Sequence, residues 1–218
     1  MKKRMIGTIM VLLLSIIIAS KVIPDSQKYY TSSEFGIDTI QSSIDKDQDG
    51  IDDYTDIYEG AKQYIATNPS YKSQYYKGGF PTDGYGVCTD VIWNSLKAAG
   101  YDLKSMIDSD IKSNPDKYPD IQTPDPNIDF RRVQNLNIFL KRNTQSLTTD
   151  LKQIEEWQPG DIVVFNKHIA ICSAKRNKKG IPFIIHHTPK GAKEANDMKH
   201  YKIIGHYRWT QTSDKPSS

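Results

Sequence analysis

Residues 86–93 read Gly-Val-Cys-Thr-Asp-Val-Ile-Trp, a turn that runs directly into a helix predicted for residues 89–99. Apolar side chains recur in this helix at helical spacing, and Gly100 is placed to end it. Cys88, one of only two cysteines in the chain, therefore lies at the N-terminus of a buried helix. The unpaired N–H groups and the positive end of the helix dipole at this position favour a thiolate.

Histidines at the ends of two apolar runs supply partners for this thiol. His168 opens the run His-Ile-Ala-Ile-Cys, and His186 ends the run Phe-Ile-Ile-His. Both runs are typical of β-strands, so each imidazole would be held on a strand, where it could act as a base and an acid. His187 follows His186 and points to the opposite face of the strand, so only one of the two can serve. The residues alone leave this choice open.

The order of the elements predicts an α+β domain at residues 45–210, with helices first and an antiparallel β-meander second. The helices are expected at residues 53–65, 89–99, 103–112 and from 130 to near 143, and the strands at 162–165, 169–174, 183–187 and 203–209. Residues 25–44 are polar and are expected to form a tether, and residues 211–218 a disordered tail.

The N-terminus has the pattern of a targeting segment, with Lys2, Lys3 and Arg4 ahead of a long apolar stretch. Residues 1–24 are expected to be a signal peptide or an N-terminal membrane anchor, and the bulk of Ile18 near the cleavage position favours the anchor. Either outcome places the domain outside the cytoplasm. The net charge of +3 comes entirely from the three basic residues at the start of the chain, so nucleic acid is not expected as a partner.

Six segments between about Gly50 and Trp209 together resemble a known family. They are Gly86-Val-Cys-Thr-Asp-Val, Asn127-Ile-Asp-Phe-Arg-Arg-Val-Gln-Asn-Leu, Trp157-Gln-Pro-Gly-Asp-Ile-Val-Val-Phe, His168-Ile-Ala-Ile, Ile185-His186 and Gly205-His-Tyr-Arg208. The set is similar to the family named domain of unknown function 1287. More widely, it resembles the NlpC-type cell-wall peptidases, a permuted bacterial branch of the papain-like superfamily.

The resemblance implies a papain-like fold in which Cys88 is the nucleophile, His168 the general base and His186 the polar residue that orients it. It also implies hydrolysis of amide or peptide bonds in cell-wall peptides, without a cofactor. Thiolate attack on the carbonyl requires these residue types, and N–H groups at the start of the helix would form part of an oxyanion hole. The chain departs from many NlpC-type enzymes at Val87 and at Thr89-Asp90, and the charge of Asp90 would raise the thiol pKa.

Two further groups of residues are candidates for binding. Arg131 and Arg132, with Asp129 beside them, could clamp a substrate carboxylate, because Arg matches a carboxylate with two hydrogen bonds. The alternative is a solvated helix face or a structural pair with Asp129. The loop from Asp45 to Asp56 follows the D-x-D-x-D-G pattern of calcium loops, and its alternative is an acidic turn that caps the next helix.

Other functions remain compatible with these residues. Cys88 could pair with Cys172 in a disulfide, which an exported protein tolerates. The domain could then be a non-catalytic wall-binding or calcium-stabilised module. It could also act on lipid or small-molecule amides, because one fold hosts many chemistries.

Overall fold

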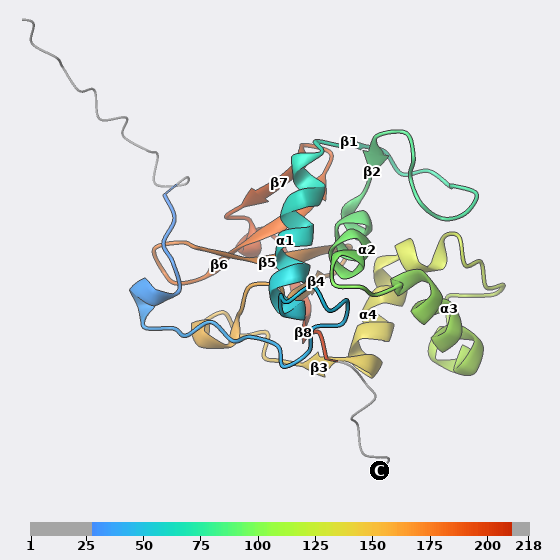
Figure 1. The fold of residues 1–218 in the computed structure, drawn as a ribbon. Coiled ribbons are helices and arrows are strands. Elements are labelled where there is room, and N and C mark those ends of the chain that lie inside the picture. Colours follow the sequence, from blue (N-terminus) through green and yellow to red (C-terminus); the bar gives the residue numbers. More distant parts are fainter. Residues whose placement is uncertain (1–27, 211–218) are drawn as a thin grey trace, which may run out of the picture.

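The computed structural model of the chain describes residues 28–210, and these form helices packed on a six-stranded antiparallel sheet, with a separate two-stranded parallel sheet (Figure 1). The helices are α1 (Asp53–Ala66), α2 (Cys88–Ala98), α3 (Leu103–Ser113) and α4 (Val133–Asn143). Single 3-10 turns are η1 (Ser33–Phe35), η2 (Pro115–Lys117), η3 (Asp129–Arg131), η4 (Ile154–Glu156) and η5 (Met198–His200). The strands are β1 (Ser70–Tyr71), β2 (Tyr85–Gly86), β3 (Gln145–Ser146), β4 (Ile162–Phe165), β5 (His168–Arg176), β6 (Pro182–Thr188), β7 (Gly191–Ala195) and β8 (Ile203–Arg208).

The α+β class and the antiparallel sheet are confirmed, but the sheet is not a plain meander. Its order is β3-β8-β4-β5-β6-β7, so the last strand returns to pair with β4 instead of following β7. β7 itself lies in a segment rich in Gly and Lys that was expected to be a loop. It pairs with β6 at the edge of the sheet, where backbone hydrogen bonds can form a strand without a buried apolar face. Helix α4 begins at Val133, after η3, and not at Phe130.

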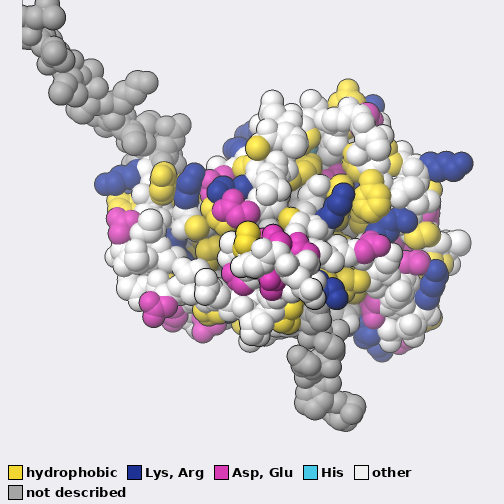
Figure 2. Space-filling model, viewed as in Figure 1, with side chains coloured by type: hydrophobic (Ala, Val, Ile, Leu, Met, Phe, Trp, Pro, Cys, Tyr) yellow, Lys and Arg dark blue, Asp and Glu magenta, His cyan; other side chains and the backbone are white. Residues whose placement is uncertain are grey.

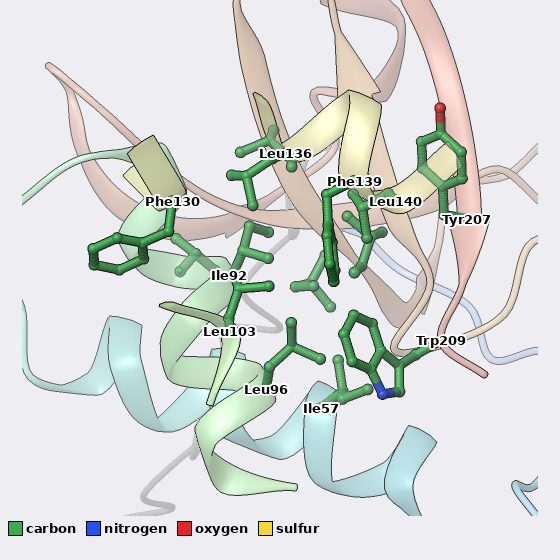
Figure 3. Packing of buried hydrophobic residues seen from close by; sticks show 14 of the residues in the cluster. Ile57, Ile92, Leu96, Leu103, Phe130, Leu136, Phe139, Leu140, Tyr207 and Trp209 are labelled. Atoms are coloured by element: carbon green, nitrogen blue, oxygen red, sulfur yellow. The ribbon is translucent and has the colours of Figure 1, made fainter. Parts of the chain in front are cut away.

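Both faces of the sheet are buried. The helices pack on one face through a cluster that includes Ile92, Leu96, Leu136 and Trp209 (Figure 3). The opposite face carries a second cluster around Trp157, which loops cover. Because side chains alternate along each strand, every strand residue belongs to one face or the other, and a chemical group on a strand has a defined side.

A buried carboxylate joins two of the segments that carry the family resemblance. Asp161 accepts hydrogen bonds from the Arg208 guanidinium at 2.8 Å and pairs with His206 Nε2 at 2.9 Å. The glycine before it, Gly160, has φ +87° and lies so close to helix α1 that a Cβ atom would be 2.5 Å from the Tyr54 carbonyl oxygen. The Pro-Gly-Asp motif therefore has a structural role, since it ties β4 to β8 and to α1.

The segment expected to be a tether packs against the domain over its described part, residues 28–44. Tyr30 forms a β-bridge with Arg176, whose buried guanidinium also donates to Ser32 Oγ at 2.9 Å. Farther along, the Gln158 amide bonds the backbone at Asp38 and Ile40. The composition is polar because this segment is held by hydrogen bonds, which leave little apolar signal in the sequence.

The expected targeting segment at residues 1–24 and the expected tail at 211–218 lie outside the described residues. Within residues 28–210, no helix combines the length and the apolar character that crossing a bilayer requires.

Helices α1 and α2 lie side by side over the sheet, and a glycine sets their distance (Figure 1). A Cβ atom at Gly60 of α1 would be 2.6 Å from Ala98 Cβ and 3.0 Å from Ser95 Cα of α2. The two backbones therefore approach more closely than any larger residue at this position would permit. This contact determines where α2, and with it Cys88, lies on the sheet.

The substitution Gly60→Ala should therefore destabilise the protein. Alanine favours a helix over glycine by about 1 kcal/mol, but the clash with α2 should cost about 1–3 kcal/mol and outweigh that gain. Urea unfolding should show a lower midpoint than for wild type. Gln63→Ala, on the exposed side of the same helix, is the control and should change stability little. An unchanged midpoint for Gly60→Ala would mean that the helices are free to move apart.

Candidate active site

Cys88 is the first residue of α2, as the sequence predicts. The chain reaches it in an extended conformation, with Val87 at φ −140° and ψ −178°, and then turns into the helix. The Cys88 side chain is only 7% exposed. The backbone N–H groups of Ile169 and Thr89 face the sulfur and work to lower its pKa. Because Ile169 directly follows His168, the thiol lies against the first residues of β5.

The space for the thiol comes from a gap in the sheet. The pairing of β5 with β6 begins at Ile171 opposite Ile185, so the first three residues of β5 have no recorded partner on β6. On their other side, these three residues pair with β4, and this pairing extends to His168, the first residue of β5. The N–H of Ile169 is therefore free to face Cys88 instead of continuing the ladder. The N-terminus of α2 therefore lies against the start of β5, at the point where β5 is not paired with β6.

A chain of polar contacts leads from His168 to a carboxylate. His168 Nε2 lies 3.0 Å from His186 Nδ1, and His186 Nε2 lies 3.2 Å from Asp197 Oδ2. The second contact is a close approach to a carboxylate and not a hydrogen bond, since His186 Nε2 has no hydrogen-bond partner. No hydrogen bond joins His168 to the Cys88 sulfur among the described residues. The thiol lies against the backbone of Ile169, the residue that follows His168.

His187 lies on the other face of β6, as strand alternation requires. Its Nδ1 is 2.8 Å from the Tyr64 hydroxyl, and its ring packs edge-on against Tyr71. Of the two adjacent histidines, the structure therefore brings His186, and not His187, to His168. The residues alone could not make this choice, because it depends on which face of the strand meets β5.

Three residues near the site were not expected from the sequence. Asp197 follows β7 and holds His186, while Tyr201 packs on the ring of His168 with ring centres 5.0 Å apart. The charge of Cys88 raises the pKa values of both Tyr201 and Tyr71, although burial is the larger cause. The two tyrosines thus border the thiol. No local signal marks these residues, because the tertiary fold alone brings their loops to the site.

Arg131 is paired with Asp90, not with a ligand or with Asp129. Its Nε and one terminal nitrogen each donate to the Asp90 carboxylate at 2.8 Å, and both side chains are 1% exposed. A third nitrogen donates to the Gln74 carbonyl oxygen at 3.1 Å. All three guanidinium nitrogens thus make structural contacts, so the structure favours the alternative of a structural pair for Arg131, with Asp90 and not Asp129 as the partner.

Arg132 and Asp129 lie differently. The Arg132 side chain is exposed, and both residues line a hollow of about 560 Å³. The Asp129 carboxylate is largely buried, and one of its oxygens accepts the Asp125 backbone N–H at 2.7 Å. Thr89 Oγ1 donates to the Arg131 carbonyl oxygen at 3.1 Å, so η3 lies against the first turn of α2. Arg132 is thus the one candidate of this group with a free guanidinium surface near the site.

Burial determines the charge state of the thiol and the histidines. It raises the pKa of Cys88 to about 11, against the effect of the N–H groups that face the sulfur. It also lowers the pKa of His168 to about 4, with a further contribution from His186, and lowers the pKa of His186 to about 4. At neutral pH the site therefore rests as a neutral thiol with neutral imidazoles. This corrects the expectation that the helix end alone favours a thiolate.

The two cysteines are not joined. Both are free, and they belong to the clusters on opposite faces of the sheet. Cys172 shares a strand face with His168 but is 0% exposed, and burial raises its pKa well above the ordinary value. The alternative of a disulfide between Cys88 and Cys172 is therefore wrong for this fold.

Residues 58–209, which contain Cys88, His168 and His186, match the family described as domain of unknown function (DUF1287). The chain belongs to this family. The protein described as uncharacterized protein YijF of Escherichia coli (strain K12) is 33% identical over 165 residues, which cover 70% of this chain and 80% of that protein. No solved structure matches the chain.

The burial of the two cysteines predicts which one reacts. Iodoacetamide should label Cys88 in the folded protein and leave Cys172 unmodified until the protein unfolds. Because only the thiolate reacts, the rate at Cys88 should keep rising up to about pH 11, the pKa of this buried thiol, whereas a free thiol has a pKa of about 8.5. Mass spectrometry of peptides from samples labelled across a pH series measures which cysteine is modified and how the rate at Cys88 depends on pH. Rapid labelling near pH 6 would instead reveal a thiolate–imidazolium pair.

The lowered histidine pKa values predict a loss of stability in acid. The folded state holds His168 and His186 near pKa 4, whereas the unfolded chain has values near 6.5, so below pH 6.5 the unfolded state binds more protons. The free energy of unfolding should fall from pH 6.5 to 4, by up to about 1.4 kcal/mol per pH unit for each histidine. Urea titrations at several pH values measure this slope.

The control for this measurement is a histidine substitution at the surface. His186→Gln should reduce the slope, while His200→Gln, at an exposed position, should keep it. Asp56, whose pKa burial raises to about 6, works in the opposite direction and is present in every variant. Equal slopes for wild type and His186→Gln would contradict the assigned burial of this imidazole.

Proposed function

We propose that the protein is a cysteine hydrolase of amide or peptide bonds on a papain-like fold, and that its substrates are cell-wall peptides. One observation carries the proposal: contacts run from Asp197 through His186 to His168, and the next residue, Ile169, directs its backbone N–H to the Cys88 sulfur at the start of a helix. This is the arrangement of nucleophile, base and orienting groups that covalent catalysis requires. The descriptions of the family and of YijF name no activity, so the proposal is based on the geometry of the site.

One set of tautomers completes the chain and leaves the base ready. With a proton on His186 Nε2, toward Asp197, the Nδ1 atom of His186 can accept from His168 Nε2–H. The lone pair of His168 is then on Nδ1, the ring atom that would accept the proton of Cys88. His186 therefore sets the tautomer of the base, and Asp197 sets the tautomer of His186. Neither group needs to carry the proton of the reaction.

The neutral resting state implies that the proton moves during attack. As the Cys88 sulfur bonds to the substrate carbonyl carbon, its proton passes to His168 Nδ1 and the carbonyl electron pair moves to oxygen. Backbone N–H groups at the start of α2 would stabilise this oxyanion. Collapse of the intermediate breaks the carbon–nitrogen bond, and His168 returns the proton to the leaving amine. Water, with His168 again as base, then cleaves the thioester.

The substrate class rests on the location of the protein and on one exposed cation. The N-terminal pattern is that of an exported or membrane-anchored protein, which would place the domain with the cell wall. Cell-wall peptides carry free carboxylates, and Arg132 presents an exposed guanidinium one residue from η3, which contacts the first turn of α2.

A second candidate is a non-catalytic wall-binding module. The observation that favours it is the burial of Cys88, together with the missing hydrogen bond to His168. For catalysis, the tyrosines beside the thiol must move when substrate binds. Catalytic contacts that tighten only in the complex with substrate are common.

Digestion of purified peptidoglycan, followed by mass analysis of the products, tests the proposal. Wild-type protein should release peptides, and Cys88→Ala should release none. His168→Ala should lower the rate by about 10²–10⁴-fold, because general acid–base catalysis contributes that much. His186→Ala should have a smaller effect, because it orients the base without replacing it.

His200→Ala is the matched control, because it removes an exposed histidine that contacts the same Asp197 carboxylate on its other side. It should leave the digestion rate nearly unchanged. Equal digestion by wild type and Cys88→Ala would exclude Cys88 as the nucleophile. Retention of wild-type protein on peptidoglycan without any release of products would establish the binding module instead.

A further inference from the structure

The acidic loop before α1 gathers three carboxylates around one point. Single oxygen atoms of Asp45, Asp47 and Asp49 all lie within 4.8 Å of one another. Figure 2 shows acidic side chains close together on the face where α1 begins, in the view of Figure 1. The loop precedes the residues that match the family, so the proposed hydrolase function does not account for it.

The backbone makes a tight turn in the segment that carries these three carboxylates. Gly50 has φ +94° and Gln48 φ +63°, so the loop makes the sharp turn that a glycine at this position of a calcium loop permits. The Asp45 carboxylate accepts the backbone N–H groups of Asp49 and Gly50, at 3.2 and 2.9 Å. These bonds arrange the loop but do not by themselves require an ion.

A fourth carboxylate, that of Asp56, is buried and has an oxygen atom without a hydrogen-bond partner. Asp56, in the first turn of α1, is 7% exposed, and its Oδ2 atom has no hydrogen-bond partner. The charges that act on it are those of Asp49, Asp47, Asp53 and Asp45, all of the same sign. An unpaired buried carboxylate under the influence of like charges is unfavourable unless it takes up a proton or a cation compensates it.

Capping of α1 does not explain this arrangement, because other residues perform it. Asp52 is the N-cap, and its side chain accepts the Tyr54 backbone N–H. Asp53 accepts from the Lys46 backbone N–H at 2.9 Å and from the Tyr101 hydroxyl. The four carboxylates at positions 45, 47, 49 and 56 are thus not needed to begin the helix.

We propose that Asp45, Asp47, Asp49 and Asp56 bind one calcium ion, with the Ile51 carbonyl oxygen as a further ligand. Calcium takes six to eight oxygen ligands in flexible geometry, and water would complete the set. Asp56 has a shorter side chain than the glutamate usual at this position, so we expect it to ligate through one oxygen. The affinity should accordingly be in the range of extracellular modules, a dissociation constant of about 10⁻⁴ to 10⁻³ M.

The ion would join two helices of the domain. The loop leads directly into α1, and its Asp47 packs at the end of α2, where a Cβ atom on Gly100 would be 3.0 Å from Asp47 Cβ. Calcium should therefore hold the start of α1 against the end of α2. The effect on the protein is stabilisation of the fold, and it is measurable without any activity assay.

Isothermal titration and thermal melting of the full chain, first stripped with EDTA, test the site. Calcium chloride should bind with one ion per chain and raise the melting temperature by about 5 °C when calcium exceeds the dissociation constant about fiftyfold. Magnesium at the same concentration should raise it less, because it demands a smaller and more rigid octahedral site. No binding and no shift up to about 5 mM calcium, or an equal shift with magnesium, would overturn the proposal.

Variants separate a ligand role from a structural one. Asp47→Asn with Asp49→Asn should lose the calcium shift, while Glu59→Gln with Asp116→Asn, which removes the same charge elsewhere on the surface, should keep it. Asp56→Asn should melt in EDTA at or above the wild-type temperature, since it removes a buried unpaired charge, and should lose most of the calcium shift. If Asp56→Asn melts lower in EDTA and keeps the calcium shift, Asp56 is a structural residue and the proposed ligand set is wrong.

Discussion

The buried ion pair between Asp90 and Arg131 is the interaction on which the candidate site depends. The Asp90 carboxylate also accepts the Val87 backbone N–H at 2.8 Å and the Trp93 indole N–H at 2.7 Å, so all of its capacity is used. It thereby fixes the turn before Cys88, the first turn of α2 and the 3-10 turn η3. Removing one partner would leave a buried charge without compensation, at a cost of about 3–5 kcal/mol. The same pair neutralises the carboxylate nearest in sequence to the thiol.

The second constraint on the candidate site is that the sheet lies between the cluster that contains Cys88 and the cluster on the histidine side. His168 and His186 share the face with Phe165 and Cys172, while Cys88 belongs to the helix side. A thiol on a helix can approach such a histidine only at the end of a strand. The missing ladder between the first residues of β5 and β6 provides this place. Backbone pairing, more than the side chains themselves, thus brings Cys88 to the start of β5, beside the residue that follows His168.

Much of the local structure follows from sequence patterns, and the errors have physical causes. Helical spacing and end signals located α2 to within one residue. β7 was missed because an edge strand without a buried face has no alternation to detect. Residues 28–44 were taken for a tether because their attachment through Arg176 is made of polar bonds. The pairing of Arg131 with Asp90 was not foreseen, because its sequence position does not reveal a partner 41 residues away.

The sequence by itself determined the fold class, the family, the position of Cys88 at a helix end and the two histidines on strands. These follow from local periodicity, capping and motif spacing, which act over a few residues. Tertiary structure alone decided that His186 and not His187 meets His168, that Asp197 holds His186, and that burial keeps the thiol and the imidazoles neutral. The reason is that strand facing, long-range contacts and desolvation depend on which elements pack together, and no short window of residues contains that information.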